Sequence, residues 1–105
     1  MQPIQRDFYS RRTDVVARDL LGKILVRRIG DEQLGGIIVE TEAYFGGDDP
    51  ASRAFNGLKE YNRVMFEEPG RLFIYHVHKY WMLNIIAHTD GVGGILIRAI
   101  EPTIG

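Results

Sequence analysis

The stretch KILVRRIGDEQLGGIIVETEAYF, residues 23–45, decides the fold because it predicts two β-strands joined by a tight turn. Lys23–Ile29 is rich in β-branched residues, and a second strand-forming run covers Leu34–Phe45. Gly30 and Asp31, between the two runs, are residue types that favour turns. The stretch therefore predicts an antiparallel pair of strands.

The residues before this pair predict a short helix that begins at Thr13 (TDVVARDLLG, residues 13–22). Thr13 or Asp14 can cap its first turn, and Gly22 is suited to its C-terminal end. The apolar residues of this segment are spaced so that the helix has a partial apolar face.

The residues after the pair predict a loop, a helical turn and further strands. Gly46–Leu58 clusters Gly, Asp, Pro, Ser and Asn without periodicity, which is typical of a surface loop, and Lys59–Glu67 can hold a helical turn. Pro69 and Gly70 indicate another turn. Three more strands are predicted at Leu72–Val77, Tyr80–Ala87 and Gly94–Ile100. The pattern as a whole predicts an α+β fold with a mostly antiparallel, twisted sheet and a few short helices.

Length and composition predict a single domain that covers residues 1–105. A chain of 105 residues, 45% of them hydrophobic, can bury one core without cross-links, and it has no cysteine for a disulfide, a thiolate nucleophile or a Cys-ligated metal. No apolar run approaches the roughly 20 residues needed to cross a bilayer, and the segment MQPIQRDFYSRR is charged where a signal peptide is apolar. We therefore expect a cytoplasmic or nucleoid-associated protein with no membrane partner.

The formal net charge of −1 hides a local asymmetry. Residues 1–30 carry seven Lys and Arg against three acids, whereas residues 31–50 carry six acids and no base. Near-neutrality argues mildly against a dedicated nucleic-acid-binding protein, because such proteins usually have a basic excess. The net charge is nevertheless a poor guide to the charge of any one surface.

The strand that ends at Phe45 carries two acids beside an aromatic residue. The alternation of side chains along a strand places Glu40, Glu42 and Tyr44 on one face. The other face takes Val39, Thr41 and Ala43. A partly buried carboxylate needs a partner or a shifted pKa, so the acidic face is a candidate site of acid–base chemistry. The alternative is a solvated edge strand whose acids pair with arginines of the neighbouring strand, Arg27 or Arg28.

Several blocks together resemble the alkyladenine (3-methyladenine) DNA glycosylase family: VETEAY followed by a Gly/Asp-rich loop, then NRVMFEEPGRLFIY, LNI and LIRAIEP, in that order. The similarity extends over nearly the whole chain, from RDFYSRRTDVVARDLLGKILVRR to RAIEP. It implies a DNA repair enzyme that flips an alkylated or deaminated purine out of double-stranded DNA and hydrolyses its N-glycosidic bond. It also implies that no metal or cofactor takes part.

The resemblance assigns the catalytic roles to Glu42 and Arg98. Glu42 matches the carboxylate that deprotonates a water and stabilises an oxocarbenium-like transition state. Arg98 matches the arginine that helps to hold this water, and the alternative for Arg98 is an ion pair with Glu101 or another surface acid. Glu40 is expected to support the structure rather than to take part in catalysis.

Four further positions match residues that bind the flipped base. Tyr44 and Tyr75 match the aromatic residues that stack on it. Asn84 matches the asparagine at the pocket floor that disfavours the exocyclic amino group of guanine, and its alternative is a hydrogen bond to local backbone. Arg53 stands where the family has a histidine that contacts the base, so a donor is retained while its geometry and fixed charge differ.

The segment IYHVHKYWMLN matches the hairpin from which the family inserts a tyrosine into the gap left by the flipped nucleotide. It is one residue shorter than the family pattern, so His78 or Val77 is expected at the tip. Either can act as the wedge, since unstacking needs bulk more than a hydroxyl. An alternative use of this region is a His-only metal site formed by His76, His78 and His88.

The resemblance implies an enzyme about twice as long, so these 105 residues correspond to its N-terminal half. We therefore expect uncovered sheet edges and apolar surface, with three explanations open: an incomplete fragment, which is favoured, a short homologue rebuilt as a homodimer, or a half protein that needs a second chain to supply the missing half. Two other classes of function remain open at this point. One is a catalytically incomplete DNA-binding module of the same ancestry, and the other is a small structural or protein-interaction domain.

Overall fold

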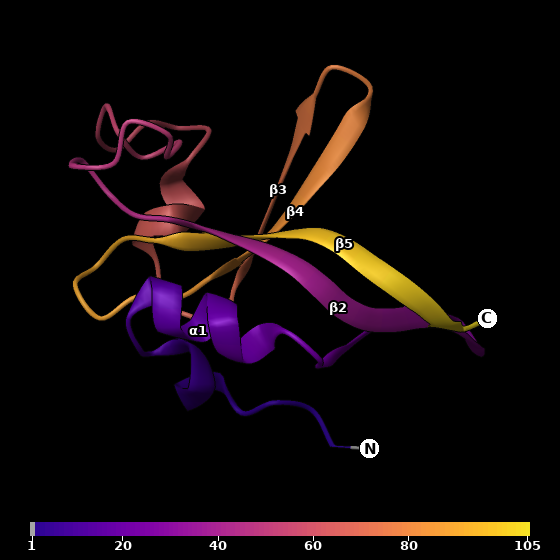
Figure 1. Cartoon of the computed structure of the whole chain (residues 1–105). Coiled ribbons are helices and arrows are strands. Elements are labelled where there is room, and N and C mark those ends of the chain that lie inside the picture. The colour runs from indigo at the N-terminus through magenta and orange to yellow at the C-terminus, as the bar shows by residue number, and fades with distance from the viewer. Residues whose placement is uncertain (1) are drawn as a thin grey trace.

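The computed structural model describes residues 2–105 and contains a five-stranded sheet in the order β1-β2-β5-β4-β3, in which all neighbours are antiparallel. Figure 1 shows the sheet with its single α-helix. The elements are η1 (Arg6–Tyr9), α1 (Thr13–Leu20), β1 (Ile24–Ile29), β2 (Glu32–Tyr44), η2 (Arg63–Phe66), β3 (Leu72–Val77), β4 (Tyr80–Ile86) and β5 (Gly94–Ile104). The predicted α+β class, helix, strands, loop and helical turn are confirmed.

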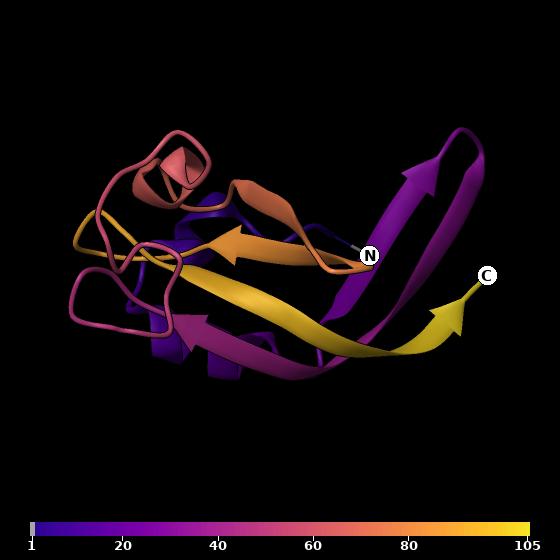
Figure 2. The same ribbon diagram turned by 90° about the horizontal axis from the view of Figure 1, so that it is seen from above.

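The two long strands, β2 and β5, form the centre of the sheet. β1 pairs only with the first half of β2, from Ile24 opposite Ile37 to Ile29 opposite Glu32. On its β5 side, β4 pairs with only the first three residues of β5, which lie opposite the other end of β2. β1 and β4 therefore pair at opposite ends of the β2–β5 pair, and Figure 2 shows this sheet from above. The β3–β4 hairpin consequently projects from the body of the protein.

One face of the sheet is covered by α1. The helix has its buried residues at spacings of one, three and four, and Val16, Ala17 and Leu20 pack with Ile38 and Ile95 of the central strands. Full burial of each large aliphatic side chain contributes roughly 1.5–3 kcal/mol. The predicted cap of this helix is wrong, because Arg12 is at the N-cap position and no side chain caps the helix.

Thr13 does not cap because its hydroxyl is used in a tertiary contact. The side chain is buried, and Oγ1 donates a hydrogen bond of 2.7 Å to the carbonyl oxygen of Ala87. Asp14 accepts from the backbone N–H of the next residue at 3.0 Å and pairs with Arg12 Nε at 2.8 Å. The first turn of α1 is thus attached to the end of β4 instead of closing on itself.

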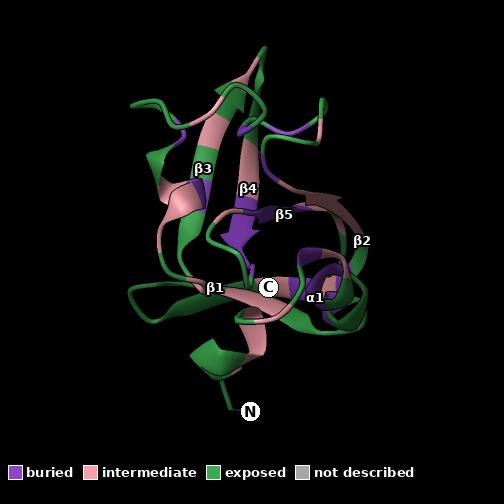
Figure 3. Ribbon diagram, turned by 90° about the vertical axis from the view of Figure 1, so that its left-hand side faces the viewer, coloured by how far each residue is buried: buried purple, intermediate pink, exposed green. Residues whose placement is uncertain are grey.

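The opposite face of the sheet is covered at one end by the loop that follows β2 and by η2. Ala54 of the loop and Met65 of η2 pack on Phe73 and Ile86. Figure 3 shows the buried residues concentrated around α1, β4 and β5, while the far end of the β3–β4 hairpin is exposed. No helix within residues 2–105 has the length and apolar character needed to cross a membrane.

Candidate active site

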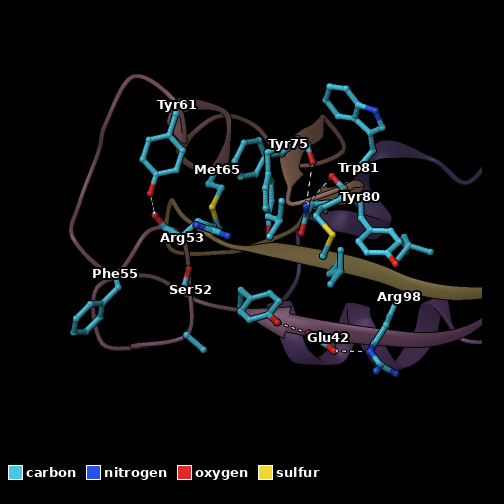
Figure 4. Close-up of a pocket in the computed structure, with 18 of the residues that line it drawn as sticks. Glu42, Ser52, Arg53, Phe55, Tyr61, Met65, Tyr75, Tyr80, Trp81 and Arg98 are labelled. Atoms are coloured by element: carbon cyan, nitrogen blue, oxygen red, sulfur yellow. Dashed lines mark hydrogen bonds and ion pairs between the residues drawn. The ribbon is translucent and has the colours of Figure 1, made fainter.

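A cavity of about 960 Å³ opens on the face of the sheet that α1 leaves free. It lies between the strands β2, β5, β4 and β3 and the loop of residues 46–58, and Figure 4 shows its side chains. Pockets that bind small molecules have volumes of about 300–1,000 Å³. All the residues with a predicted catalytic, base-binding or wedge role line this cavity: Glu42, Tyr44, Arg53, Tyr75, Val77, His78, Asn84 and Arg98.

Two offset β-bulges between β2 and β5 set the direction of the acidic side chains. The register shifts leave Val39 unpaired on β2 and Arg98 unpaired on β5. Ile38 and Thr41 therefore both face α1, since Ile38 is 2% exposed and the Thr41 hydroxyl donates to the Ala17 carbonyl at 2.8 Å. The prediction that Val39 shares a face with Thr41 and Ala43 is wrong, because the bulge at Val39 breaks the alternation and leaves it 46% exposed.

Arg98 holds the carboxylates of Glu40 and Glu42 on β2. Its Nη1 lies 2.6 Å from Glu40 Oε1, and its Nε lies 3.2 Å from Glu42 Oε2. The three side chains are between 38% and 58% exposed, so solvent screens these ion pairs and they add little to stability. Their main consequence is positional, because Arg98 fixes the direction of the Glu42 carboxylate.

The alternative pairings considered for these charges are not what the structure contains. Arg27 and Arg28 lie opposite Leu34 and Gln33, at the other end of β2 from Glu40 and Glu42. The ion pairs of Arg98 are formed with Glu40 and Glu42 and not with Glu101. Glu40 and Glu42 are therefore paired within the cavity by Arg98 and not by the arginines of the neighbouring strand.

Tyr44 completes the arrangement around Glu42. Its hydroxyl donates a hydrogen bond to Glu42 Oε1, so each oxygen of this carboxylate has a partner. This hydrogen bond, together with partial burial, raises the pKa of Tyr44 to about 12. Tyr44 is therefore a neutral donor at physiological pH, and the predicted placement of Glu40, Glu42 and Tyr44 on one face is confirmed.

Arg53 and Tyr75 meet at the loop side of the cavity. The guanidinium carbon of Arg53 lies 4.9 Å from the centroid of the Tyr75 ring, a cation–π contact. Figure 4 shows the side chain extending from the loop toward this ring. Tyr75 also packs against Phe73, with ring centroids 5.0 Å apart. The aromatic wall of the cavity is therefore built by β3, and its polar edge is supplied by the loop.

Three polar residues that the sequence analysis did not single out hold this loop. Asp49 accepts from the backbone of Phe45 at 2.9 Å, and the Ser52 hydroxyl donates to the Phe45 carbonyl. Asn62 is completely buried, and its Nδ2 donates to the Arg53 carbonyl at 2.8 Å. Asp and Ser in DDPAS are typical turn formers and could have been chosen from sequence. Nothing in the sequence marks Asn62, since its partners lie up to nine residues away.

Asn84 forms part of the cavity wall on β4. It is 4% exposed, and its Nδ2 donates to the Phe73 carbonyl of the neighbouring strand at 3.1 Å. Nδ2 also donates to the Met82 carbonyl at 3.4 Å, so the alternative of a hydrogen bond to local backbone is observed together with a position in the cavity. The amide group has a fixed orientation because its nitrogen is held by these bonds.

The tip of the β3–β4 hairpin consists of His78 and Lys79, because Val77 and Tyr80 form the last pair of the ladder. His78 is exposed and has a φ of 55°, a conformation that few residues other than glycine adopt. Val77 is partly buried and lines the cavity behind the tip. Of the two wedge candidates, His78 is thus the one at the tip.

Two of the three histidines considered as metal ligands are used in other ways. His88 is buried, its Nε2 lies 2.8 Å from the Glu67 carbonyl, and its Nδ1 accepts from the Gly91 N–H at 3.2 Å. His76 stacks on Trp81 with ring centroids 4.7 Å apart. Within residues 2–105, no three His, Cys, Asp or Glu side chains are grouped as metal ligands. The metal-site alternative is therefore wrong.

Comparison with known proteins shows the family to which the chain belongs. A family model described as "Methylpurine-DNA glycosylase (MPG)" matches residues 7–105. The chain therefore belongs to the methylpurine-DNA glycosylase family. This agrees with the resemblance inferred from the sequence blocks.

Individual relatives agree with the family model. Three proteins named "Putative 3-methyladenine DNA glycosylase" come from Aeropyrum pernix, Clostridium perfringens and Methanocella arvoryzae, and this chain is 46%, 49% and 47% identical to them. The alignments cover 94%, 95% and 100% of this chain but only 52%, 50% and 54% of the relatives. The chain thus spans about half the length of the curated relatives it matches.

Proposed function

We propose that this protein hydrolyses the N-glycosidic bond of alkylated or deaminated purines that are flipped out of double-stranded DNA. The observation that carries the proposal is the arrangement around Glu42, whose two carboxylate oxygens are held by the Tyr44 hydroxyl and by Arg98 at the edge of an aromatic cavity. A DNA-binding module without catalysis has no need of a carboxylate fixed from both sides. The geometry therefore favours the enzyme.

Glu42 acts on water and on the sugar. Each carboxylate oxygen has a second lone pair besides the one used by Tyr44 or Arg98, so Glu42 can accept a proton from a water. The oxygen of that water bonds to C1′ as the bond between C1′ and N9 breaks, the bonding electron pair leaves with the base, and the water proton passes to Glu42. The negative charge of Glu42 also stabilises the oxocarbenium-like sugar.

Arg98 and Tyr44 position this carboxylate. Arg98 fixes Oε2 and offers further N–H groups with which to hold the water. Tyr44 fixes Oε1 and presents its ring to the cavity, where it can stack on the base. Every step of this mechanism uses side chains of the chain itself.

The remaining cavity residues bind the base and fill the gap in the duplex. Tyr75 stacks on the flipped purine together with Tyr44, and Arg53 and Asn84 contact its edges. His78, at the projecting tip, enters the space that the nucleotide has left, with Val77 behind it. The proposed partner is therefore double-stranded DNA, and the protein acts on the chromosome.

We also propose a surface that binds another protein chain, on the face of the β3–β4 hairpin that points away from the cavity. Leu72 and Ile74 are 55% and 52% exposed there, and Trp81 is 71% exposed. Apolar side chains grouped in this way usually mark an interface. We expect a second copy or another chain to cover them, and the sedimentation mass of the purified protein, with and without Ile74→Ser, measures this. A monomer at all concentrations contradicts self-association.

The decisive experiment measures release of damaged bases from duplex DNA. We expect release of hypoxanthine or 3-methyladenine, and a loss on the order of 10²- to 10⁴-fold in Glu42→Gln while DNA binding is retained. The matched control is Glu40→Gln, which changes the neighbouring acid on the same face. A folded, DNA-binding preparation that releases no modified purine overturns the proposal, as does release that Glu42→Gln leaves unchanged.

A further inference from the structure

Arg53 differs from the other arginine of the cavity in what it contacts. Arg98 is paired with two carboxylates, whereas Arg53 forms no ion pair with an acid in the described part of the chain. The cavity is therefore electrically polar. Its sheet side, with Glu40, Glu42 and Arg98, has one negative charge in excess, and its loop side has the positive charge of Arg53.

The position of the Arg53 guanidinium is constrained from both ends. Its backbone carbonyl accepts from Asn62 Nδ2 at 2.8 Å and from the Tyr61 hydroxyl at 3.2 Å, and its guanidinium rests on the ring of Tyr75. A purine that stacks on Tyr75 from the cavity must lie beside this guanidinium or displace it. In both cases the N–H donors of Arg53 are within reach of the edge of the base.

We infer that Arg53 makes the site selective for uncharged 6-oxopurines, of which hypoxanthine is the simplest, over purines that alkylation at N3 or N7 has made cationic. The inference rests on the proposed function, since it names the substrate class of the same site. A 6-oxopurine presents the two acceptors O6 and N7 on one edge, and arginine binds this pair with two parallel hydrogen bonds.

The same contacts disfavour the binding of adenine and of cationic alkylated purines. Arginine has donors and no acceptor, so it cannot pair with the N6 amino group of adenine. A cationic alkylated purine is repelled by the fixed positive charge, and it competes with Arg53 for the face of Tyr75. Guanine shares O6 and N7 with hypoxanthine, so Arg53 does not distinguish these two bases.

The polarity of the cavity also matches the chemistry of a neutral base. When the bond to C1′ breaks, an uncharged purine leaves with the electron pair and becomes negative at the side of Arg53, while the sugar becomes positive at the side of Glu42. A base that is already cationic leaves as a neutral molecule and gains nothing from Arg53. The guanidinium thus acts on both the binding and the departure of a 6-oxopurine.

The test compares two lesions in otherwise identical duplexes, hypoxanthine and the cationic 7-methylguanine, under single-turnover conditions. In Arg53→Gln we expect the ratio of the kcat/KM for hypoxanthine to that for 7-methylguanine to fall on the order of tenfold to a hundredfold. Arg53→Lys keeps the charge without the paired donors, and its ratio should lie in between. Arg28→Gln, an exposed arginine on β1, is the control and should leave the ratio unchanged. A ratio that is the same in Arg53→Gln as in the unmodified protein overturns the inference.

A binding measurement separates this inference from the proposed function. In Glu42→Gln protein, affinity for the hypoxanthine duplex is compared with affinity for the same duplex with adenine. We expect tighter binding to hypoxanthine and loss of the difference when Arg53→Gln is added. If base release fails but this preference is present, the proposed hydrolysis falls and the selectivity of Arg53 stands. If release occurs but the preference is absent, the selectivity falls and the hydrolysis stands.

Discussion

The two faces of β2 are stabilised in different ways, although they belong to one strand. Toward α1 the strand presents Ile38, Thr41 and Ala43, which pack into the core or donate to the helix backbone. Toward the cavity it presents Glu40 and Glu42, which are partly exposed and held by an arginine. Burial on the first face supplies stability, whereas screened ion pairs on the second supply little. The chemistry of the cavity can therefore be changed without unfolding the protein.

The largest effect on stability is expected at the α1 face. Leu20 is 1% exposed and packs in the core cluster with Ile38 and Ile95. Leu20→Ala should lower the free energy of unfolding by about 2–5 kcal/mol, because it leaves a cavity in the core. Urea denaturation measures this. The matched control is Leu21→Ala, one residue further on and 45% exposed, for which a change of about 0.5 kcal/mol is expected. Equal losses in the two variants contradict the assignment of the core face.

A smaller effect on stability is expected at Asn62, the buried amide that holds the loop over the cavity. Asn62→Ala removes two bonds to loop carbonyls and one to the Lys59 N–H, at distances of 2.7–3.1 Å. Leaving these backbone groups unpaired should cost about 1–3 kcal/mol. Amide hydrogen exchange in residues 53–59 should speed up more than in β5. Asn56→Ala, an exposed residue of the same loop, is the control, and identical exchange in both variants removes the anchoring role.

Local patterns predicted most of the fold. The helix, the five strands and the loop follow from β-branched runs, turn residues and the spacing of apolar residues, which are properties of short segments. β5 continues to Ile104, past the predicted end at Ile100, although Pro102 is a residue type that sheets seldom accommodate. Past Leu96, however, β5 pairs with β2 alone, so its other edge needs no donor and tolerates proline.

Features that depend on distant partners could not be predicted. The outward turn of Val39 depends on bulges between β2 and β5, and the partner of Thr13 is the carbonyl of Ala87. The pairing of Arg98 with the β2 acids and the anchoring by Asn62 likewise require the three-dimensional structure. The family resemblance supplied the residues of the site, while the structure supplied the contacts among them.

The next prediction concerns the pH dependence of the cavity face. The pKa of Tyr44 rises from 10.0 to about 12 on folding, mainly through its hydrogen bond to Glu42. The stabilisation is therefore complete below pH 10 and is lost as the pH rises toward 12, because the unfolded chain ionises first. Urea midpoints should fall more between pH 9 and pH 11.5 in the unmodified protein than in Tyr44→Phe. The loss in free energy of unfolding should be about 1 kcal/mol larger in the unmodified protein than in Tyr44→Phe, since the Tyr44–Glu42 pair is partly solvated. If the urea midpoints of the two proteins fall in parallel with pH, the prediction is contradicted.

The smallest effect is expected at Glu40, which tests whether the two acids of the cavity face have different roles. Glu40→Gln breaks the 2.6 Å ion pair with Arg98, but both side chains are at least half exposed, so the free energy of unfolding should change by less than about 1 kcal/mol. Arg98 keeps its contact with Glu42, and base release should fall by less than about tenfold, far less than in Glu42→Gln. If Glu40→Gln abolishes release while Glu42→Gln retains it, the carboxylate that activates water is Glu40, and the Tyr44 hydrogen bond then marks the supporting acid rather than the catalytic one.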